Sequence, residues 1–542
     1  MSDVFSLLHP QLQEFLAERD WKPTPVQEQA IPELMDGNER LLIAPTGSGK
    51  TLAAVLPLLH RCKVEAWKPL SILYITPLRA LNRDVDRRLA ELSEALNLRF
   101  ALRHGDTPTN ERSKQVRRPP HLLVTTPETF QLMFTGHRLR AMLSSVQAVI
   151  IDEVHDLAAS ERGWQLRLGL QRLEALCGRT LQKVGLSATV GNPEHVASWI
   201  SDSSCQPILA PAERSTVLTV ETAPPLPEDE VGAMEMRLSP RAHATFRLLG
   251  EIVEKDPPCL VFVNSRNAAE TVAQRLQTMA PHLAIGVHHG SLAAETRQDM
   301  EENIRNGSLQ GLICTSSLEL GIDVGSIRKI VQLESPRSVD RMLQRVGRAD
   351  HRIGGIGRGH LLAWETDGIA ESAVIAHRSH LGFIEDVAWR NRPYSIAANQ
   401  IMLMAHSFKV VRIDDVHEIF SQTEQFEDWT RRDTENVLTV LADRWLLRYS
   451  IQPNDTPWYR WPKHLYLAAK EAIPDGEQWP DELPRYDVAD EDIPAEYKSM
   501  RMPVPNQFKQ GWFASAGRTR RWVEHHLSMI PDKQSYRVRD VV

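Results

Sequence analysis

The chain of 542 residues has few cysteines and no long apolar run. Its five cysteines are odd in number and widely scattered, which argues against a disulfide framework, a zinc site or an iron–sulfur cluster. No apolar stretch approaches the ~20 residues that a membrane span needs. The first residues, Met1 to Phe5, lack the basic region and apolar core of a signal peptide. We therefore expect a cytoplasmic protein.

The chain also lacks an overall positive charge. Its 63 Lys and Arg residues against 70 Asp and Glu give a formal net charge of −7, so any nucleic-acid surface must be a local stripe. The hydrophobic share of 42% and the charged share of 25% exclude a disordered chain. The length suggests roughly three or four globular domains.

What the sequence does contain is a candidate phosphate-binding loop. Leu41 to Ile43 predict the end of a buried strand, a glycine turn follows, and Lys50 and Thr51 open a helical run. Glycines turn backbone N–H groups toward an anion, and the helix adds its positive dipole end. Ala44 replaces the first glycine of the commonest motif, and for this loop alone an ordinary glycine turn is the alternative. We predict that ATP is bound by Thr46, Gly47, Ser48, Gly49, Lys50 and Thr51, with Lys50 reaching the β- and γ-phosphates and the Thr51 hydroxyl holding Mg²⁺.

Short apolar runs then alternate with helical stretches, which predicts a parallel sheet with helices on both faces. The runs are residues 71–75, 121–124, 147–151 and 183–186. Ligands of such sheets bind at the carboxyl ends of the strands, where Asp152 and Glu153 follow the third run. We predict that Asp152 holds Mg²⁺ and that Glu153 orients or deprotonates the attacking water. Gln27, in the first turn of a helix that Thr24 caps, is a candidate adenine reader; the alternative is an ordinary capped surface helix.

The second half repeats this architecture without a second glycine loop. A proline-rich acidic stretch, 223–230, predicts a linker. Further strands are expected at 259–263, 285–287, 311–314, 330–333 and 360–363. The helical stretch at 344–348 spaces Arg345, Arg348 and Arg352 by three and four residues, on one face. The planar guanidinium groups of these arginines could contact the γ-phosphate of a nucleotide bound to the first domain. The alternative is that they form salt bridges on an ordinary helix surface.

As an ordered set, these motifs resemble the DEAD/DEAH-type helicases of superfamily 2. The resemblance rests on Gln27, the phosphate loop, 152–155, 187–189, 315–323 and 344–348. Within that superfamily the chain is similar to the large helicase-related (Lhr) family, through 103–107, 161–166, 185–193 and 527–532. The resemblance implies an ATP-driven translocase that moves 3′ to 5′ on single strands and unwinds DNA or RNA–DNA duplexes. The alternative from another class is an ATP-gated annealer or clamp that separates no strands.

The resemblance also implies roles for individual residues. Nucleic-acid contacts are expected at Thr76, Arg79, Thr126, Asn264, Arg266 and Thr315. Asp323, Arg345 and Arg348 are expected to contact the nucleotide from the second domain. Coupling of hydrolysis to movement is expected from His155, Ser187, Thr189 and Gln344.

The fold class that we expect is α/β, with two tandem RecA-like domains followed by a winged helix and a partial C-terminal module. The expected bounds are 1–220 for domain 1, 221–230 for a linker, 231–395 for domain 2, 396–472 for the winged helix and 473–542 for the last module. A small helical spacer is the alternative to the winged helix. Trp512 and Trp522 are candidates for stacking on bases.

The pattern of the family continues beyond residues 527–532, whereas this chain ends at Val542. We therefore expect a shortened family member with robust ATPase activity and weak unwinding. Its partners would be single-stranded and tailed duplex nucleic acid, DNA or RNA, bound by a monomer.

Overall fold

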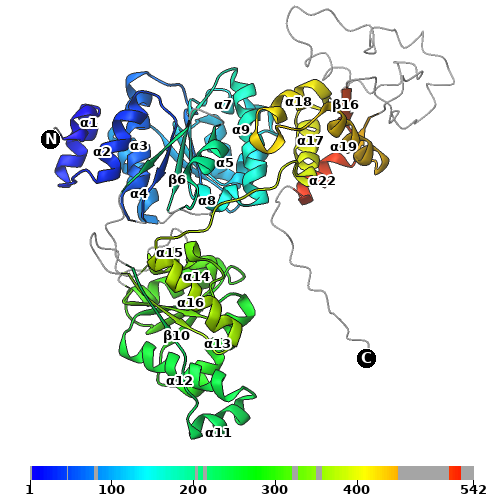
Figure 1. Ribbon diagram of the computed structural model, residues 1–542. Helices are drawn as coiled ribbons and strands as arrows, with labels where there is room; N and C mark the ends of the chain where they lie inside the picture. The colour runs from blue at the N-terminus through cyan, green and yellow to red at the C-terminus, as the bar shows by residue number, and fades with distance from the viewer. Residues whose placement is uncertain are drawn as a thin grey trace, which may run out of the picture.

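The computed structural model describes residues 3–45, 47–77, 83–188, 190–201, 205–210, 216–319, 327–348, 357–449 and 512–526. These residues form three units (Figure 1): a blue-to-cyan first domain, a green second domain and a yellow-to-red third unit. None of the helices among them is long and apolar enough to cross a membrane.

Domain 1 is built on a parallel sheet of seven strands. Its order is β3-β4-β2-β5-β6-β1-β7, with β1 (Arg40–Ile43), β2 (Ile72–Ile75), β3 (Phe100–Arg103), β4 (Leu122–Thr125), β5 (Ala148–Ile151), β6 (Gln182–Ser187) and β7 (Gln206–Leu209). The helices are α1 (Pro10–Glu18), α2 (Pro25–Met35), α3 (Lys50–Val64), α4 (Arg83–Ala95), α5 (Thr109–Arg117), α6 (Pro127–Met133), α7 (His137–Leu143), α8 (Val154–Ala158), α9 (Glu161–Cys177) and α10 (Pro193–Ile200), after the 3-10 turn η1 (Val4–Leu7). Strands β3 and β7 were missed in the sequence, because they lie at the sheet edges and are incompletely buried.

Both faces of this sheet are covered, because alternate strand residues point to opposite sides. Leu42 and Tyr74 pack in one apolar core with α2, α3 and α4. Leu41 and Leu73 pack in a second core with α6, α8, α9 and α10. The buried strands are therefore almost entirely apolar, and their polar residues gather at the ends.

Domain 2 contains a parallel sheet of six strands in the order β10-β11-β9-β12-β13-β8. The strands are β8 (Thr216–Glu221), β9 (Cys259–Phe262), β10 (Ile285–His288), β11 (Gly311–Cys314), β12 (Lys329–Leu333) and β13 (Gly357–Leu362). The helices are α11 (Pro227–Met236), α12 (Pro240–Lys255), α13 (Arg266–Met279), α14 (Ala294–Arg305), α15 (Val339–Val346) and α16 (Thr366–His380), with the 3-10 turn η2 (Ser316–Leu318). The prediction of two parallel-sheet domains is confirmed.

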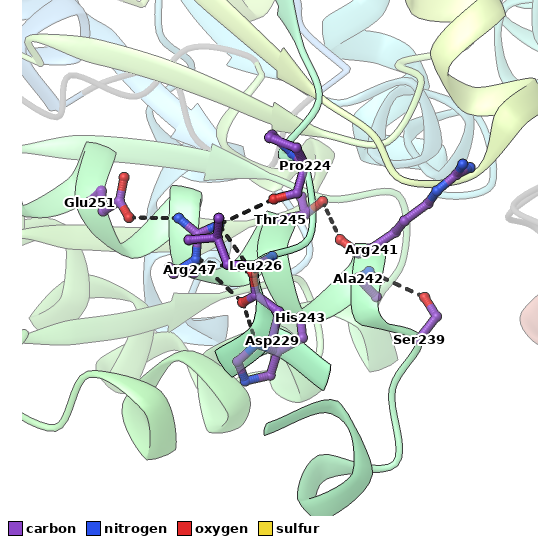
Figure 2. Close-up of polar contacts among 10 residues, drawn as sticks. All are labelled: Pro224, Leu226, Asp229, Ser239, Arg241, Ala242, His243, Thr245, Arg247 and Glu251. Carbon is purple, nitrogen blue, oxygen red and sulfur yellow. Dashed lines mark hydrogen bonds and ion pairs between the residues drawn. The ribbon is translucent and has the colours of Figure 1, made fainter. Parts of the chain in front are cut away.

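The predicted linker at 221–230 is wrong. β8 ends at Glu221 and pairs with β13, so domain 2 begins before this stretch. The acidic residues open α11, and Figure 2 shows how this helix is fixed to α12. The fully buried Asp229 carboxylate accepts hydrogen bonds from His243 Nδ1 at 2.8 Å, Arg247 Nη2 at 3.1 Å and the backbone N–H of Leu226 at 2.8 Å. The proline-rich composition reflects a helix start, where Pro227 fits the first position.

The third unit joins segments that are far apart in the sequence. Its elements are α17 (Tyr394–Phe408), β14 (Val410–Arg412), α18 (Ile413–Ser421), η3 (Glu424–Phe426), α19 (Arg431–Asp443), β15 (Leu447–Arg448), β16 (Trp512–Ser515) and α22 (Thr519–His526). The three strands form an antiparallel sheet in the order β14-β16-β15. The separate module at 473–542 is therefore wrong for residues 512–526, because β16 completes this sheet and Phe513 is fully buried in the same core.

The third unit is attached to domain 1 through α9. Trp164 and Leu168 of α9 belong to the apolar core of the third unit. A buried polar contact lies beside them, in which Gln165 Nε2 donates to Asn399 Oδ1 at 2.7 Å. Arg172 Nη1 donates to Gln400 Oε1 at 3.0 Å, and burial lowers the pKa of Arg172 to about 9. These contacts join domain 1 and the third unit along α9 (Figure 1).

Candidate nucleotide and nucleic-acid site

The phosphate loop connects β1 to α3 as expected. Gly47 and Gly49 have φ values of 79° and 90°, which favour glycine. A Cβ atom on Gly49 would lie 2.5 Å from Gln27 Nε2, so close packing also requires glycine there. α3 begins at Lys50 with no side-chain cap, which leaves its first N–H groups for an anion. Thr46 lies outside the described residues.

Gln27 lies directly against this loop. Its side chain is 3% exposed; Oε1 accepts from the backbone N–H of Thr24 at 3.1 Å and Nε2 donates to the carbonyl of Gly49 at 3.2 Å. Both ends of the amide therefore have partners within the chain. Its role as an adenine reader stays a prediction, but its position beside the nucleotide loop fits one.

Lys50 marks the point where the two domains meet. Its Nζ donates to the carbonyls of Ala44 and, at 3.1 Å, of Pro45. Burial lowers the pKa of Lys50, while Glu153 and Asp152 oppose this shift and Arg348 of domain 2 adds to it. The positive charge of Arg348 therefore contributes to the electrostatic environment of Lys50, and the site is influenced by charged groups of both domains.

Asp152 and Glu153 follow β5 at the same edge of the sheet. Burial raises the pKa of Asp152 to about 7, and the Glu153 carboxylate adds to this shift. Tyr74 donates its hydroxyl hydrogen to Asp152 Oδ2 at 2.7 Å, and the backbone N–H of Glu153 donates to Oδ1 at 3.0 Å. Glu153 adopts a left-handed conformation with φ 49°, which is uncommon for a non-glycine residue and concentrates at functional sites.

This arrangement fits Mg²⁺. Two adjacent carboxylates in a buried setting repel each other, and a divalent cation relieves that repulsion. The Thr51 side chain lowers the pKa of Tyr74, although burial raises it overall, so Thr51 lies on the same side of the site as Tyr74 and its partner Asp152. No group of three or more His, Cys, Asp or Glu side chains that could hold a metal is found in the described part of the chain. One carboxylate and one hydroxyl suit Mg²⁺, which keeps waters and phosphate oxygens as its other ligands.

Tyr74 was missed in the sequence, although a signal for it is present. It is the one polar side chain in the strand Ile72–Ile75, and it is completely buried. A buried tyrosine hydroxyl needs a hydrogen-bond partner. A tyrosine in a strand beside the strand of Asp152 therefore points to a contact with that carboxylate.

A hydrogen-bonded chain crosses from domain 1 to domain 2. Ser187 Oγ lies 2.9 Å from His155 Nδ1, and Gln344 Nε2 lies 2.7 Å from His155 Nε2. Because an amide nitrogen donates, His155 Nε2 accepts and the ring proton is placed on Nδ1, from which it is donated to Ser187. The expected coupling residues His155, Ser187 and Gln344 are brought together, whereas Thr189 lies outside the described residues.

The two arginines of the second domain differ in their surroundings. Arg345 donates from Nε to Glu319 Oε1 at 2.7 Å and from Nη1 to Gln332 Oε1, both within domain 2. Arg348 lies beyond the end of α15, and its Nη2 donates to the carbonyl of Glu319 at 2.7 Å. The shared helical face expected for the pair is therefore wrong, because the helix ends between them. Asp323 and Arg352 lie outside the described residues.

The expected nucleic-acid residues lie at the carboxyl ends of strands in both domains. Thr76 and Thr315 follow β2 and β11 and are 3% and 9% exposed. Thr126 caps α6, where its Oγ1 accepts from the backbone N–H of Thr129 at 3.3 Å. Asn264 Nδ2 donates to the carbonyl of Ser335 at 2.9 Å, and Arg266 is exposed at the start of α13. Arg79 lies outside the described residues, as does the side chain of Trp512, while Trp522 packs on the core of the third unit.

The comparisons with known proteins agree with this site. The family model described as DEAD/DEAH box helicase matches residues 24–196, and the model described as helicase conserved C-terminal domain matches residues 244–354. The chain is 33% identical over 460 residues to the ATP-dependent helicase Lhr-Core of Saccharolobus solfataricus, covering 81% of this chain and 52% of the relative. It is 33% identical over 498 residues to the Lhr helicase/uracil glycosylase of Escherichia coli, covering 79% of this chain and 32% of the relative.

Solved structures are also similar. The structure of Mycobacterium smegmatis helicase Lhr bound to ssDNA and AMP-PNP matches with a TM-score of 0.72 and 33% identity, covering 81% of this chain and 58% of that chain. The helicase MrfA bound to DNA, at 20% identity and a TM-score of 0.64, shares the fold. The chain spans about half the length of the archaeal relative. With both motor domains matched and the Lhr proteins similar over four fifths of its length, the chain belongs to the DEAD/DEAH box helicases and is similar to the Lhr helicases among them.

Proposed function

We propose that the chain is an ATP-dependent helicase and translocase that moves 3′ to 5′ on a single strand and unwinds DNA or RNA–DNA duplexes. The observation that carries this proposal is the contact across the two domains, in which Gln344 hydrogen-bonds to His155; the influence of the Arg348 charge on the pKa of Lys50 agrees with it. A nucleotide bound at Lys50 would lie against both sheets. Its hydrolysis would then change the contact between the domains.

Each residue of the site has a chemical task in this proposal. Lys50 and the N-terminus of α3 bind phosphates, and Glu153 takes the proton of the attacking water. Mg²⁺, when bound through Thr51 and Asp152, neutralises phosphate charge. Arg348 supplies a planar cation from the second domain, whereas Arg345 orients Glu319 and hence the carbonyl that Arg348 contacts.

The third unit supports a role in holding the strand. Its element order supports a winged helix: helix α17 is followed by strand β14, helices α18 and α19 and then strands β15 and β16. We infer that it is one and that it moves with domain 1, since α9 shares its core. Both halves of the nucleotide site come from one chain, so we propose a monomer. ATP and nucleic acid occur together in the cytoplasm, where we place the protein.

The experiment is a strand-separation assay on 3′-tailed and 5′-tailed duplexes of DNA and of RNA–DNA, run beside ATP turnover. We expect turnover to rise with single strands and 3′-tailed duplexes to be separated in preference. Glu153→Gln is the matched control, because it should bind ATP yet neither hydrolyse it nor separate strands. Stimulated turnover without separation of any duplex would instead support an ATP-gated annealer or clamp. Turnover by Glu153→Gln equal to that of the wild type would refute the assigned chemistry.

A further inference from the structure

The chain between domain 2 and the third unit runs along domain 1 (Figure 1). We call residues 384–389 of this connection the strap. Residues 385, 387 and 389 are partly buried whereas 386, 388 and 390 are exposed, which is the alternation of an extended segment that lies on a surface. The strap is therefore docked on domain 1 along one side.

The strap is anchored on domain 1 through Asn192, five residues after Ser187. Asn192 Nδ2 donates to the carbonyl of Val387 at 2.9 Å, and the backbone N–H of Val387 donates to Asn192 Oδ1 at 2.9 Å. Val387 and Trp389 pack against the apolar core of domain 1. The Trp389 ring also stacks on His195 with centroids 3.8 Å apart and 10° between the planes.

Gly191 allows this close approach. A Cβ atom added to Gly191 would lie 2.5 Å from the carbonyl oxygen of Ile384 and 2.8 Å from that of Glu385. Any side chain at this position would push the strap away from the segment that follows Ser187. The docked backbone therefore requires glycine here.

The strap is anchored on domain 2 through Glu385. Its carboxylate accepts from the backbone N–H of Val339 at 2.9 and 3.0 Å, and from that of Asp340 at 3.3 Å. These are the first residues of α15, a helix with no cap from the side chain of Ser338. A carboxylate at a helix N-terminus makes charge-assisted hydrogen bonds and interacts favourably with the helix dipole. Gln344 lies on this helix and Arg348 follows its end.

The two anchors are two residues apart, at Glu385 and Val387. An extended chain spans at most about 3.6 Å per residue, so the Cα atoms of the two anchors stay within about 7 Å of each other, and only the length of the Glu385 side chain adds to this reach. The N-terminus of α15 therefore cannot leave Asn192 while both anchors hold. Movement of domain 2 at this point is restricted to rotation.

We propose that the strap is the pivot between domains 1 and 2 and that Glu385 is a positioning residue for Gln344 and Arg348. The strap ties the start of α15 to the segment after Ser187, so that when domain 2 rotates toward domain 1, Arg348, just beyond the end of α15, approaches the nucleotide on a fixed path. This inference rests on the proposed function, and it assigns to Glu385 a contact that regulates the nucleotide site.

The test compares Glu385→Ala, Asn192→Ala and their double variant with Glu371→Ala in the full chain. Glu371 is a matched control, because its exposed ion pair with exposed Arg337 contributes little. We expect kcat with saturating single strands to fall by at least about fivefold in each single variant, the lower end of coupling between sites. Nucleotide affinity should be unchanged, because the phosphate loop is untouched. The double variant should be within about twofold of the weaker single variant, because both act through one tether.

Gly191→Ala and Glu385→Gln guard against simple misfolding. Glu385→Gln keeps the shape of the side chain and should lower kcat with an unchanged thermal midpoint. Gly191→Ala removes no hydrogen-bonding group but displaces the strap, and it should lower kcat as well. Wild-type kcat in both Glu385→Ala and Asn192→Ala would overturn the proposal. A double variant whose fold decrease in kcat equals the product of the two single decreases would also overturn it. A wild-type chain that single strands do not stimulate would instead contradict the proposed function itself.

Discussion

Replacing Arg345 by alanine should unfold domain 2 more readily rather than act first on catalysis. The guanidinium group is 3% exposed and donates from Nε to Glu319 Oε1 at 2.7 Å and from Nη1 to the fully buried Gln332. It also lies 5.1 Å from the centroid of the Phe262 ring. Removing one partner of a buried ion pair leaves an unpaired charge and costs about 3–5 kcal/mol. We expect the free energy of unfolding of domain 2 to fall by about that amount.

Calorimetry on the full chain measures this effect, because the transition of domain 2 should move down by about 6–20 °C. Arg348→Ala is the control, because its hydrogen bond to the backbone carbonyl of Glu319 is worth only about 1 kcal/mol. The double change Arg345→Met with Glu319→Leu should recover part of the loss, because neither charge is then left unpaired. An Arg345→Ala variant with an unchanged midpoint but no ATP turnover would refute this reasoning and make Arg345 a nucleotide contact.

Asp229, Gln344 and Tyr74 each allow a further test. Burial raises the pKa of Asp229, but its hydrogen bonds from Arg247, Leu226 and His243 outweigh this and lower the pKa to about 2. In the unfolded chain this pKa is about 3.9. The Asp229 carboxylate therefore stabilises domain 2 above about pH 4, and this stabilisation is lost as the pH falls toward 2. Asp229→Asn should flatten that pH dependence in acid unfolding; an unchanged curve would contradict it. Gln344→Ala should lower stimulated kcat about fivefold without changing nucleotide affinity, in line with one lost hydrogen bond; weakened binding with normal kcat would contradict the coupling role. Tyr74→Phe should raise the Mg²⁺ concentration for half-maximal turnover by about tenfold, and an unchanged requirement would show that Tyr74 does not orient Asp152.

The site could be predicted from the sequence where local chemistry is distinctive. Glycines before Lys50 and a carboxylate pair after an apolar strand together indicate a nucleotide site far more specifically than either feature alone. The sequence could not separate Arg345 from Arg348, because their spacing of three residues suggests one helical face. The end of α15 at Val346 and the Glu319 carboxylate, which is distant in the sequence, decide that difference.

The domain bounds were less predictable for a similar reason. All residues of β8 are exposed or half-buried, so its apolar side chains do not mark a core strand, and its place in the sheet of domain 2 is set by pairing with β13. β16 pairs with a strand about a hundred residues earlier, β14, which no local pattern shows. The strap has no periodic apolar run either, and Asn192 and Glu385 acquire their roles only when α15 and domain 1 meet.

ATP turnover by the wild type and by Arg348→Lys, with and without single strands, tests the central claim most directly. The account predicts turnover that single strands stimulate in the wild type. It predicts a loss of about 10³-fold or more in Arg348→Lys, because a point charge does not replace a planar guanidinium at a transferring phosphate. Nucleotide binding should be retained in both. Full, stimulated turnover by Arg348→Lys would contradict the claim that domain 2 completes the nucleotide site.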